Sequence, residues 1–225
     1  MSIFGAWFSL PFDWFIRSTG RPDLFNETAR LLPRLKKDSR IAVRALLLNC
    51  LNRDYSEFWA RAWDEAYRGD GWLSGDGRLT AWGGHIGSGG VWTGATPLRT
   101  ALDRRQALIE LDVLVTRALG LSLEDLILMY RVSFTVLRKY EGETYYDRRG
   151  RCVFSTKKGE SYLSRKEWEG IRGMESGCYE KVVKEAVFGD EAVERTVVYE
   201  APFGRKDREA DYREAWDALE RREGK

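Results

Sequence analysis

The apolar residues in the first third of the chain recur with a helical period. Residues 3–16 are rich in aromatic side chains and predict a short strand or turn that leads into a helix, since Pro11 is typical of a first helical turn. Residues 41–51 carry leucines at roughly helical spacing. In residues 55–63 the apolar positions fall at i, i+3, i+4, i+7 and i+8, which predicts an amphipathic helix.

The helical period stops where glycines cluster around Trp72, Trp82 and Trp92. A flexible Gly/Ser linker lacks such aromatic anchors, so this stretch predicts an irregular loop packed by its own tryptophans. It is also the best candidate for an internal boundary. We therefore divide the chain into an N-terminal part (residues 1–68), the Gly/Trp-rich loop (69–98) and a C-terminal part (99–225).

Helical spacing returns in the C-terminal part at residues 102–119, and Gly120 lies where a helix commonly ends. Ser122 and Asp125 form a capping-box pattern that begins another helix. Residues 206–222 predict a closing helix with one apolar face and one face of mixed charge.

β-Structure is expected in two places. Residues 144–155 contain two short β-prone runs around Arg149-Gly150, which predicts a β-hairpin with its turn there. Residues 194–199 predict another strand. The sequence thus predicts an α+β fold that is mainly helical, with a β-hairpin, a further short strand and a long Trp/Gly-rich loop in the middle.

Charge and cysteine content limit the possible partners. The 37 basic and 35 acidic residues leave a net charge of +2, so any electrostatic footprint for nucleic acid must be local. Cys50, Cys152 and Cys178 are odd in number and widely spaced, which indicates neither a disulfide framework nor a zinc site. The apolar N-terminus is interrupted well short of a membrane span. We expect no membrane partner and a cytoplasmic location.

Several classes of active site are excluded by residue types. His85 is the single histidine, which removes sites that need two, and it is interpreted as an ordinary loop residue rather than a general base. The glycine-rich loop matches neither a P-loop nor a dinucleotide fingerprint. A metal nuclease built on carboxylates and a lysine is a minor alternative to plain surface charge; its residues would be Glu191, Glu194, Glu200 and Lys206. We predict no metal site.

Asp112 is expected on the same helix face as Leu108 and Val115, so its carboxylate enters an apolar interface. A buried acid needs a partner, which Arg104, Arg105 or an arginine from elsewhere could supply. A structural ion pair is therefore favoured over catalysis.

The strongest local charge lies between residues 128 and 173, where eleven basic residues outnumber six acidic ones and tyrosines lie between them. Arginines on a hairpin turn could contact DNA phosphates or guanine edges. Basic residues also protect exposed strand edges from aggregation, and the residues leave both interpretations open. The predicted DNA-binding residues are Arg148, Arg149, Arg151, Lys157, Lys158, Arg165 and Lys166.

The stretch Ser9-Leu10-Pro11-Phe12-Asp13-Trp14, followed by Leu24-Phe25-Asn26, resembles the target-recognition region of large adenine-specific restriction-modification and phage-defence DNA methyltransferases, which are type IIG-like. The likeness continues in residues 104–115, 130–154 and 194–203, and covers most of residues 9–216. The residues assigned structural or interface roles in this region are Asp13, Trp14, Arg105 and Asp112.

The family's cofactor-binding glycine motif and its Asn-Pro-Pro-Tyr-like tetrad do not occur in this sequence. The resemblance therefore implies a division of labour, in which a catalytic methyltransferase domain or subunit binds S-adenosylmethionine and flips the adenine, while this chain grips double-stranded DNA. No catalytic residue is carried over, and no activity is expected of the chain alone. The alternative is an interaction subunit of a defence complex that touches DNA little.

Overall fold

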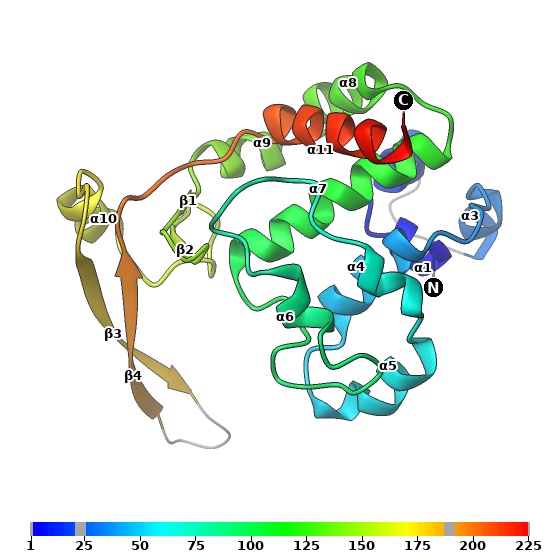
Figure 1. Cartoon of the computed structure of the whole chain (residues 1–225). Helices are drawn as coiled ribbons and strands as arrows, with labels where there is room; N and C mark the ends of the chain where they lie inside the picture. The colour runs from blue at the N-terminus through cyan, green and yellow to red at the C-terminus, as the bar shows by residue number, and fades with distance from the viewer. Residues whose placement is uncertain (1, 21–25, 187–191, 225) are drawn as a thin grey trace. The chain divides into compact units, whose positions relative to one another are not determined.

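The computed structural model describes residues 2–20, 26–186 and 192–224. Over these residues the fold is α+β and mainly helical, with two antiparallel β-hairpins, as Figure 1 shows. The chain divides into two compact units. Unit 1 comprises Met1–Arg99, Asp103–Thr135 and Arg208–Lys225, and unit 2 comprises Thr100–Leu102 and Val136–Asp207. The Gly/Trp-rich loop, predicted as a boundary, lies within unit 1.

Unit 1 is built from helices. Its α-helices are α1 (Ser2–Ala6), α2 (Leu10–Ser18), α3 (Asn26–Leu31), α4 (Ser39–Asn49), α5 (Ser56–Ala62), α6 (Trp82–Ile86), most of α7 (Ala101–Ala118), α8 (Leu123–Ser133) and α11 (Arg208–Glu223). Two 3-10 turns, η1 (Arg53–Tyr55) and η2 (Glu65–Gly69), flank α5. Leu24 and Phe25, which belong to the resemblance, lie outside the described residues.

The predicted helix is present as α2, with Pro11 in its first turn, whereas the residues before it form the short helix α1 and a turn rather than a strand. Gly5 and Ala6 bring α1 against α4: a Cβ atom on Gly5 would lie 2.7 Å from Cγ2 of Ile41. The small residues thus occupy the inner side of α1, and Phe4 and Trp7 remain 42% and 44% exposed. Packing against α4, rather than the aromatic content, decides the conformation here.

α7 is the longest helix of unit 1, and α8 and α11 run beside it (Figure 1). Its side chains from Arg105 to Thr116 are buried, with the single exception of Leu108. A helix enclosed on nearly all sides must find partners for every polar side chain it carries. We therefore expect buried ion pairs at Arg105, Glu110 and Asp112.

The ends of α7 and α8 agree with the capping pattern in the sequence. Gly120, after α7, adopts a φ of 73°, a left-handed conformation that glycine adopts without strain. At the start of α8, the Asp125 N–H donates to Ser122 Oγ at 3.1 Å, and the Ser122 N–H donates to Asp125 Oδ2 at 2.8 Å. The predicted capping box is confirmed.

Tryptophans hold the Gly/Trp-rich loop together, as its composition predicts. The rings of Trp72 and Trp82 meet edge to face with centroids 5.1 Å apart. The Trp72 indole N–H donates to the carbonyl of Thr80 at 2.8 Å, and the Trp92 indole N–H donates to the carbonyl of Cys50 at 2.8 Å. The loop is therefore anchored at several points, and it contains the short helix α6.

Unit 2 contains α9 (Thr135–Gly142), β1 (Tyr145–Tyr146), β2 (Cys152–Phe154), α10 (Arg165–Ile171), β3 (Cys178–Ala186) and β4 (Ala192–Glu200). The predicted β1–β2 hairpin is present. The predicted further strand is part of β4, which pairs over nine residues with the unpredicted strand β3, from Cys178 opposite Glu200 to Ala186 opposite Ala192. The sequence therefore predicted one half of a second hairpin.

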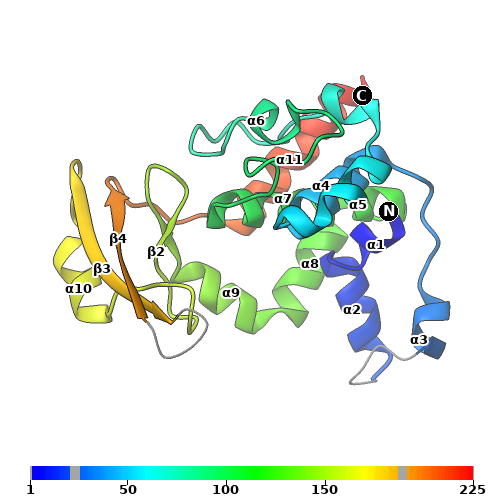
Figure 2. The same cartoon turned by 90° about the horizontal axis from the view of Figure 1, so that it is seen from below.

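The core of unit 2 is formed by β2, α10 and one face of the β3–β4 ribbon. Figures 1 and 2 show α10 and the ribbon side by side. The Trp168 ring stacks on the Phe154 ring at a centroid distance of 5.5 Å. Val183 and Val197 are buried, whereas Val182, on the opposite ribbon face, is 58% exposed. One ribbon face is therefore open to solvent.

Candidate nucleic-acid interface

The seven predicted DNA-binding residues all lie in unit 2, on three segments. Arg148, Arg149 and Arg151 belong to the turn between β1 and β2. Lys157 and Lys158 follow β2, and Arg165 and Lys166 form the first turn of α10. Their side chains have different surroundings, which separates them into contact candidates and structural residues.

The β1–β2 turn is held in one conformation by the buried carboxylate of Asp147. Its Oδ1 accepts hydrogen bonds from the N–H groups of Arg149 at 2.9 Å and Arg151 at 2.8 Å. Its Oδ2 accepts from the N–H of Glu200, at the end of β4, at 3.3 Å. Gly150 supplies a φ of 74°, which residues with a side chain rarely adopt. The turn is thereby fixed to β4 as well as to itself.

Arg151 serves the structure of the hairpin. Its half-buried guanidinium donates to the carbonyl of Val198 in β4 at 2.6 Å. Arg149 is more available, since its side chain is 64% exposed and its Nε lies 2.7 Å from Glu200 Oε2. Arg148 is exposed, and over the described ranges its guanidinium has no hydrogen-bond or ion-pair partner. The three turn arginines therefore have three different roles.

The remaining predicted residues divide in the same way. Lys157 forms an ion pair with Glu160, and the Arg165 guanidinium lies over the Phe154 ring, 5.8 Å from its centroid. Lys158 and Lys166 are exposed and have no ionic partner in the part of the chain that the structure describes. The cations with uncommitted side chains are thus Arg148, Lys158 and Lys166.

Arg172, which directly follows α10, belongs to the same class. It belongs to the basic stretch of residues 128–173, but it is not one of the seven predicted DNA-binding residues. It is exposed, and its side chain also has no acidic partner among the described residues. Its exposure follows from its place directly after α10, which packs inward through Trp168 and Ile171, and not from any pattern in the sequence.

Charge is unevenly distributed within unit 2. Residues 136–172 contain ten basic and six acidic residues, whereas residues 173–207 contain five basic and eight acidic residues. The β3–β4 ribbon belongs to the acidic part, so its shape alone does not make it a DNA-binding element. Positive potential is concentrated on the β1–β2 hairpin, the loop after it and α10.

Asp112, one of the predicted structural residues, is paired inside unit 1. Its Oδ2 accepts from Arg208 Nη1 at 2.8 Å and from the Tyr212 hydroxyl at 2.6 Å, while Oδ1 accepts from the N–H of Leu10 at 2.6 Å. Burial and the neighbouring Asp112 carboxylate raise the pKa of Tyr212 well above its ordinary value. Of the partners considered from the sequence, the arginine from elsewhere is the one found.

The other three predicted structural residues differ in burial. Arg105 is buried and its Nη1 lies 2.5 Å from Asp211 Oδ2, so it links α7 to α11. The Asp13 side chain is 46% exposed and pairs with Arg17 at 3.0 Å within α2, next to the partly buried Trp14. Arg105 thus forms a buried ion pair with an aspartate of α11, whereas the Asp13 pair lies at the surface.

Sequence reasoning missed a further buried ion group around Arg44. Its guanidinium contacts Glu110 at 2.6 Å and Asp70 at 2.5 Å, and it donates to the carbonyl of Gly71 at 2.8 Å. Burial opposes its charge, but the attraction of the two carboxylates outweighs burial and raises its pKa. The group joins α4, α7 and the Gly/Trp-rich loop, which are far apart in the sequence.

The described carboxylates of the alternative metal nuclease site do not lie close together. Glu194 and Glu200 lie six residues apart on β4, which separates them by about 20 Å. Glu194 pairs with Lys184 at 3.0 Å, and Glu200 pairs with Arg149. Glu191 lies outside the described residues. Within those residues no three histidine, cysteine or acidic side chains gather where a metal ion could bind.

His85 and Cys50 are buried by the fold, and Cys152 is partly buried. The His85 ring is 3% exposed, lies edge to face with Trp72, and places Nδ1 3.0 Å from the carbonyl of Ala95. Burial raises the pKa of Cys50 to about 11 and that of Cys152 to about 12, so both remain protonated thiols near neutral pH. Neither thiol is suited to act as a nucleophile.

Comparison of the chain with protein-family models, with curated proteins and with solved structures finds no match. None of the helices in residues 2–20, 26–186 and 192–224 has both the length and the apolarity needed to cross a bilayer. Any functional proposal therefore depends on the geometry described above and on the resemblance found in the sequence.

Proposed function

We propose that the basic part of unit 2 contacts double-stranded DNA, and that the chain is the target-recognition part of a site-specific adenine DNA methyltransferase of a restriction-modification or phage-defence system. The observation that carries the proposal is the β1–β2 turn, which is fixed by Asp147 and presents Arg148 and Arg149 to solvent. The resemblance of residues 9–216 to such enzymes supplies the class of reaction.

A fixed turn favours binding because its backbone has little conformational entropy left to lose. Arg148 lies between residues whose N–H groups are bonded, and its own N–H donates to the carbonyl of Glu200 at 2.9 Å. Only the side chains of Arg148 and Arg149 would then have to be ordered when DNA binds. Arginine suits this position because its planar guanidinium can donate two hydrogen bonds to a phosphate or to a guanine edge.

The charge distribution favours the same surface. Lys158, Lys166 and Arg172 add exposed cations on the segments that follow the turn, and acidic residues gather in the other part of unit 2. Such a surface gives most of its binding energy through phosphates and carries little sequence information by itself. Base readout would fall to arginines that reach the groove, with Arg148 and Arg149 as the first candidates.

S-adenosylmethionine and the flipped adenine would belong to a catalytic domain or subunit that works together with this chain. Under this proposal the chain positions that partner on DNA and has no methyl-transfer activity alone. A cytoplasmic location is part of the same proposal.

The proposal is tested by anisotropy measurements with a fluorescently labelled duplex. Replacing Arg148, Lys158, Lys166 and Arg172 with alanine is expected to weaken binding by roughly tenfold for each phosphate interaction removed near 0.1 M salt. Arg151 is left in place because its replacement would disturb β4 rather than remove a DNA interaction. The matched control replaces four exposed cations of unit 1, namely Arg34, Lys36, Arg61 and Arg213. Equal weakening in both variants would contradict a surface located in unit 2.

A second candidate, an interaction subunit of a defence complex, is favoured by one observation. α1 buries its small residues and exposes Phe4, and Trp7 and Phe8, which follow α1, are 44% and 38% exposed. Aromatic groups of this size are common at the centres of protein interfaces. A chain with no duplex affinity at low salt that co-purifies with a partner, and loses it when Trp7 becomes serine, would support this function over DNA binding.

A further inference from the structure

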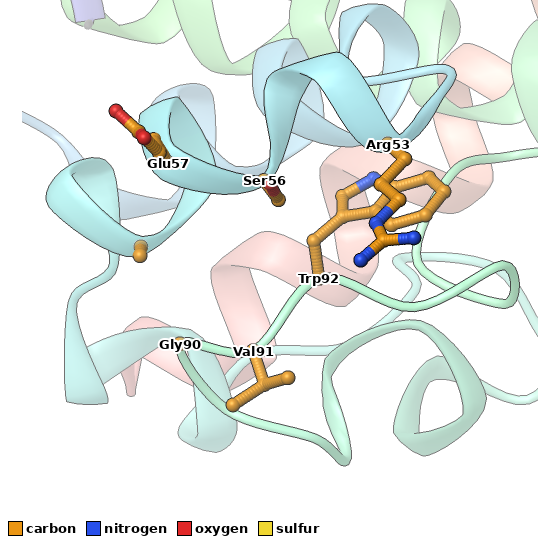
Figure 3. Close-up of a pocket in the computed structure, with 7 residues that line it drawn as sticks. Arg53, Ser56, Glu57, Gly90, Val91 and Trp92 are labelled. Carbon is orange, nitrogen blue, oxygen red and sulfur yellow. The ribbon is translucent and has the colours of Figure 1, made fainter.

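A surface pocket of about 520 Å³ lies in unit 1, far along the sequence from the basic stretch. Figure 3 shows η1 and α5 on one side of it and the loop from Gly90 to Trp92 on the other. Its volume falls within the range of small-molecule sites. The lining residues are Arg53, Ser56, Glu57, Ala60, Gly90, Val91 and Trp92.

Both walls of the pocket are held by hydrogen bonds or close packing. The indole N–H of Trp92 donates to the carbonyl of Cys50 at 2.8 Å, which fixes the ring. Gly90 lies against Trp63, where a Cβ atom on Gly90 would make ordinary van der Waals contact with the ring at 3.5 Å. The preceding carbonyl, of Gly89, accepts from the buried Trp59 indole at 2.9 Å. The pocket therefore exists before any ligand binds.

The pocket offers two uncommitted hydrogen-bond donors. In the described part of the chain neither the guanidinium of Arg53 nor the hydroxyl of Ser56 has a hydrogen-bond or ion-pair partner. Arg53 and Trp92 line the pocket from opposite walls, and in Figure 3 the Glu57 carboxylate points away from both. Arg61 pairs with Glu57 at 3.2 Å and offsets its charge. The cation, the hydroxyl and the indole therefore define the chemistry of the pocket.

We propose that this pocket binds a nucleotide. Phosphate oxygens would accept hydrogen bonds from Arg53 and Ser56, because a guanidinium is the side chain best matched to phosphate geometry. The planar base would lie against the indole of Trp92 and the side chain of Val91, since aromatic faces stack on any base. The same chemistry is present in a free nucleotide and in the end of a DNA strand. The inference goes beyond the duplex contact proposed for unit 2 and does not depend on it.

Isothermal titration calorimetry of the full chain with deoxyadenosine monophosphate tests this inference. We expect saturable binding that weakens by about tenfold or more in Arg53→Ala, because a charge-assisted hydrogen bond is removed. Deoxyadenosine and inorganic phosphate, each lacking one half of the ligand, are expected to bind less tightly than the nucleotide. Arg34→Ala, which removes an equal charge from unit 1 outside the pocket and away from the Arg61–Glu57 pair, should leave the affinity unchanged.

Two oligonucleotides distinguish the two sources of the ligand. Tighter binding of a 5′-phosphorylated oligodeoxyadenylate than of the mononucleotide, with loss of that preference in Arg53→Ala, would assign the pocket to a DNA strand end. Weaker binding of the oligonucleotide would assign it to a free nucleotide. Absence of saturable binding for both ligands would overturn the proposal, as would equal affinities in the wild type and in Arg53→Ala. Arg53 is exposed, so its replacement should not disturb folding.

Discussion

Asp112 shows how a charged residue is retained inside a helix that is buried on nearly every side. Its two oxygens receive hydrogen bonds from Leu10, Arg208 and Tyr212, so neither oxygen is left in the core without a hydrogen bond. These partners come from α2 and α11, at opposite ends of the sequence. The carboxylate therefore holds both ends of the chain against α7.

Replacing Asp112 with alanine should destabilise the protein by roughly 3–5 kcal/mol, because the charge of Arg208 would stay buried without its partner. Urea unfolding followed by circular dichroism measures the change. Asp13→Ala is the matched control: its pair with Arg17 is exposed at the surface, and its removal should cost less than about 1 kcal/mol. Equal effects of the two substitutions would mean that the Asp112 group is not buried as described.

Glu167, at the start of α10, predicts a pH dependence. Hydrogen bonds from Lys181 and Ser164 lower the pKa of its carboxyl from 4.5 to about 2. A lowered pKa contributes stability above the unfolded value of 4.5, and this contribution is lost as the pH falls towards 2. The wild type should therefore be more stable than Glu167→Gln near neutral pH, with the difference shrinking between pH 4.5 and 2. A difference that stays constant over this range would argue against the ion pair with Lys181.

At the residue scale, the sequence predicts that a buried charge needs a partner more reliably than it predicts which residue is that partner. The helical position of Asp112 was enough to predict a buried ion pair. Its partner Arg208 lies 96 residues away, and no local pattern could select it over Arg104 or Arg105. Likewise Arg148, Arg149 and Arg151 look equivalent in the sequence. Their roles differ because, among the three guanidinium groups, that of Arg151 donates to a backbone carbonyl of β4, a strand more than 40 residues later.

At the scale of elements, the stability of α1 depends on the close contact between Gly5 and Ile41 of α4. Its five residues are too few to form a stable helix alone, so packing against α4 must supply the stability. Gly5 permits that packing, since a side chain there would meet both Cγ2 and the backbone oxygen of Ile41, at 2.7 Å and 2.9 Å. Backbone atoms of α4 cannot move aside easily, so α1 itself would have to shift.

Gly5→Ala should therefore cost roughly 1–3 kcal/mol through overpacking. Gly83→Ala provides a contrast, because Gly83 also lies in a five-residue helix but a Cβ atom there would meet nothing within 4 Å. That substitution should be neutral or stabilise the protein by up to about 1 kcal/mol through helix propensity. Thermal unfolding of the two variants distinguishes them. A tolerated Gly5→Ala would show that α1 does not lie this close to α4.

Elements were predicted well where their ends are marked by local chemistry. The capping box at Ser122, the glycine after α7 and the turn at Gly150 all lie where the sequence places them. β3 was missed because glutamates and lysines interrupt its apolar positions, and among its described side chains only Val183 is buried. Its pairing with β4 supplies the regularity that its own sequence lacks.

At the scale of the whole molecule, a net charge of +2 hides an uneven distribution. The basic stretch was visible in the sequence, since it depends on composition alone. The sequence does not show which of these cations lack a partner within the protein. Ion pairs such as Arg149 with Glu200, and the contact of the Arg165 guanidinium with the Phe154 ring, depend on the fold. Within the predicted set, the side chains of Arg148, Lys158 and Lys166 have no ionic partner among the described residues, Arg149 pairs with Glu200, and Arg172 is a further exposed cation outside that set.

The central claim, that the basic part of unit 2 contacts DNA phosphates, is tested most directly by the salt dependence of duplex affinity. For the wild type, the logarithm of the association constant should fall linearly with the logarithm of salt concentration. In Arg148→Ala/Lys166→Ala the slope should become shallower by about two units, at roughly 0.9 for each phosphate interaction removed, while Arg34→Ala/Lys36→Ala keeps the wild-type slope. An unchanged slope and affinity in Arg148→Ala/Lys166→Ala would contradict the account.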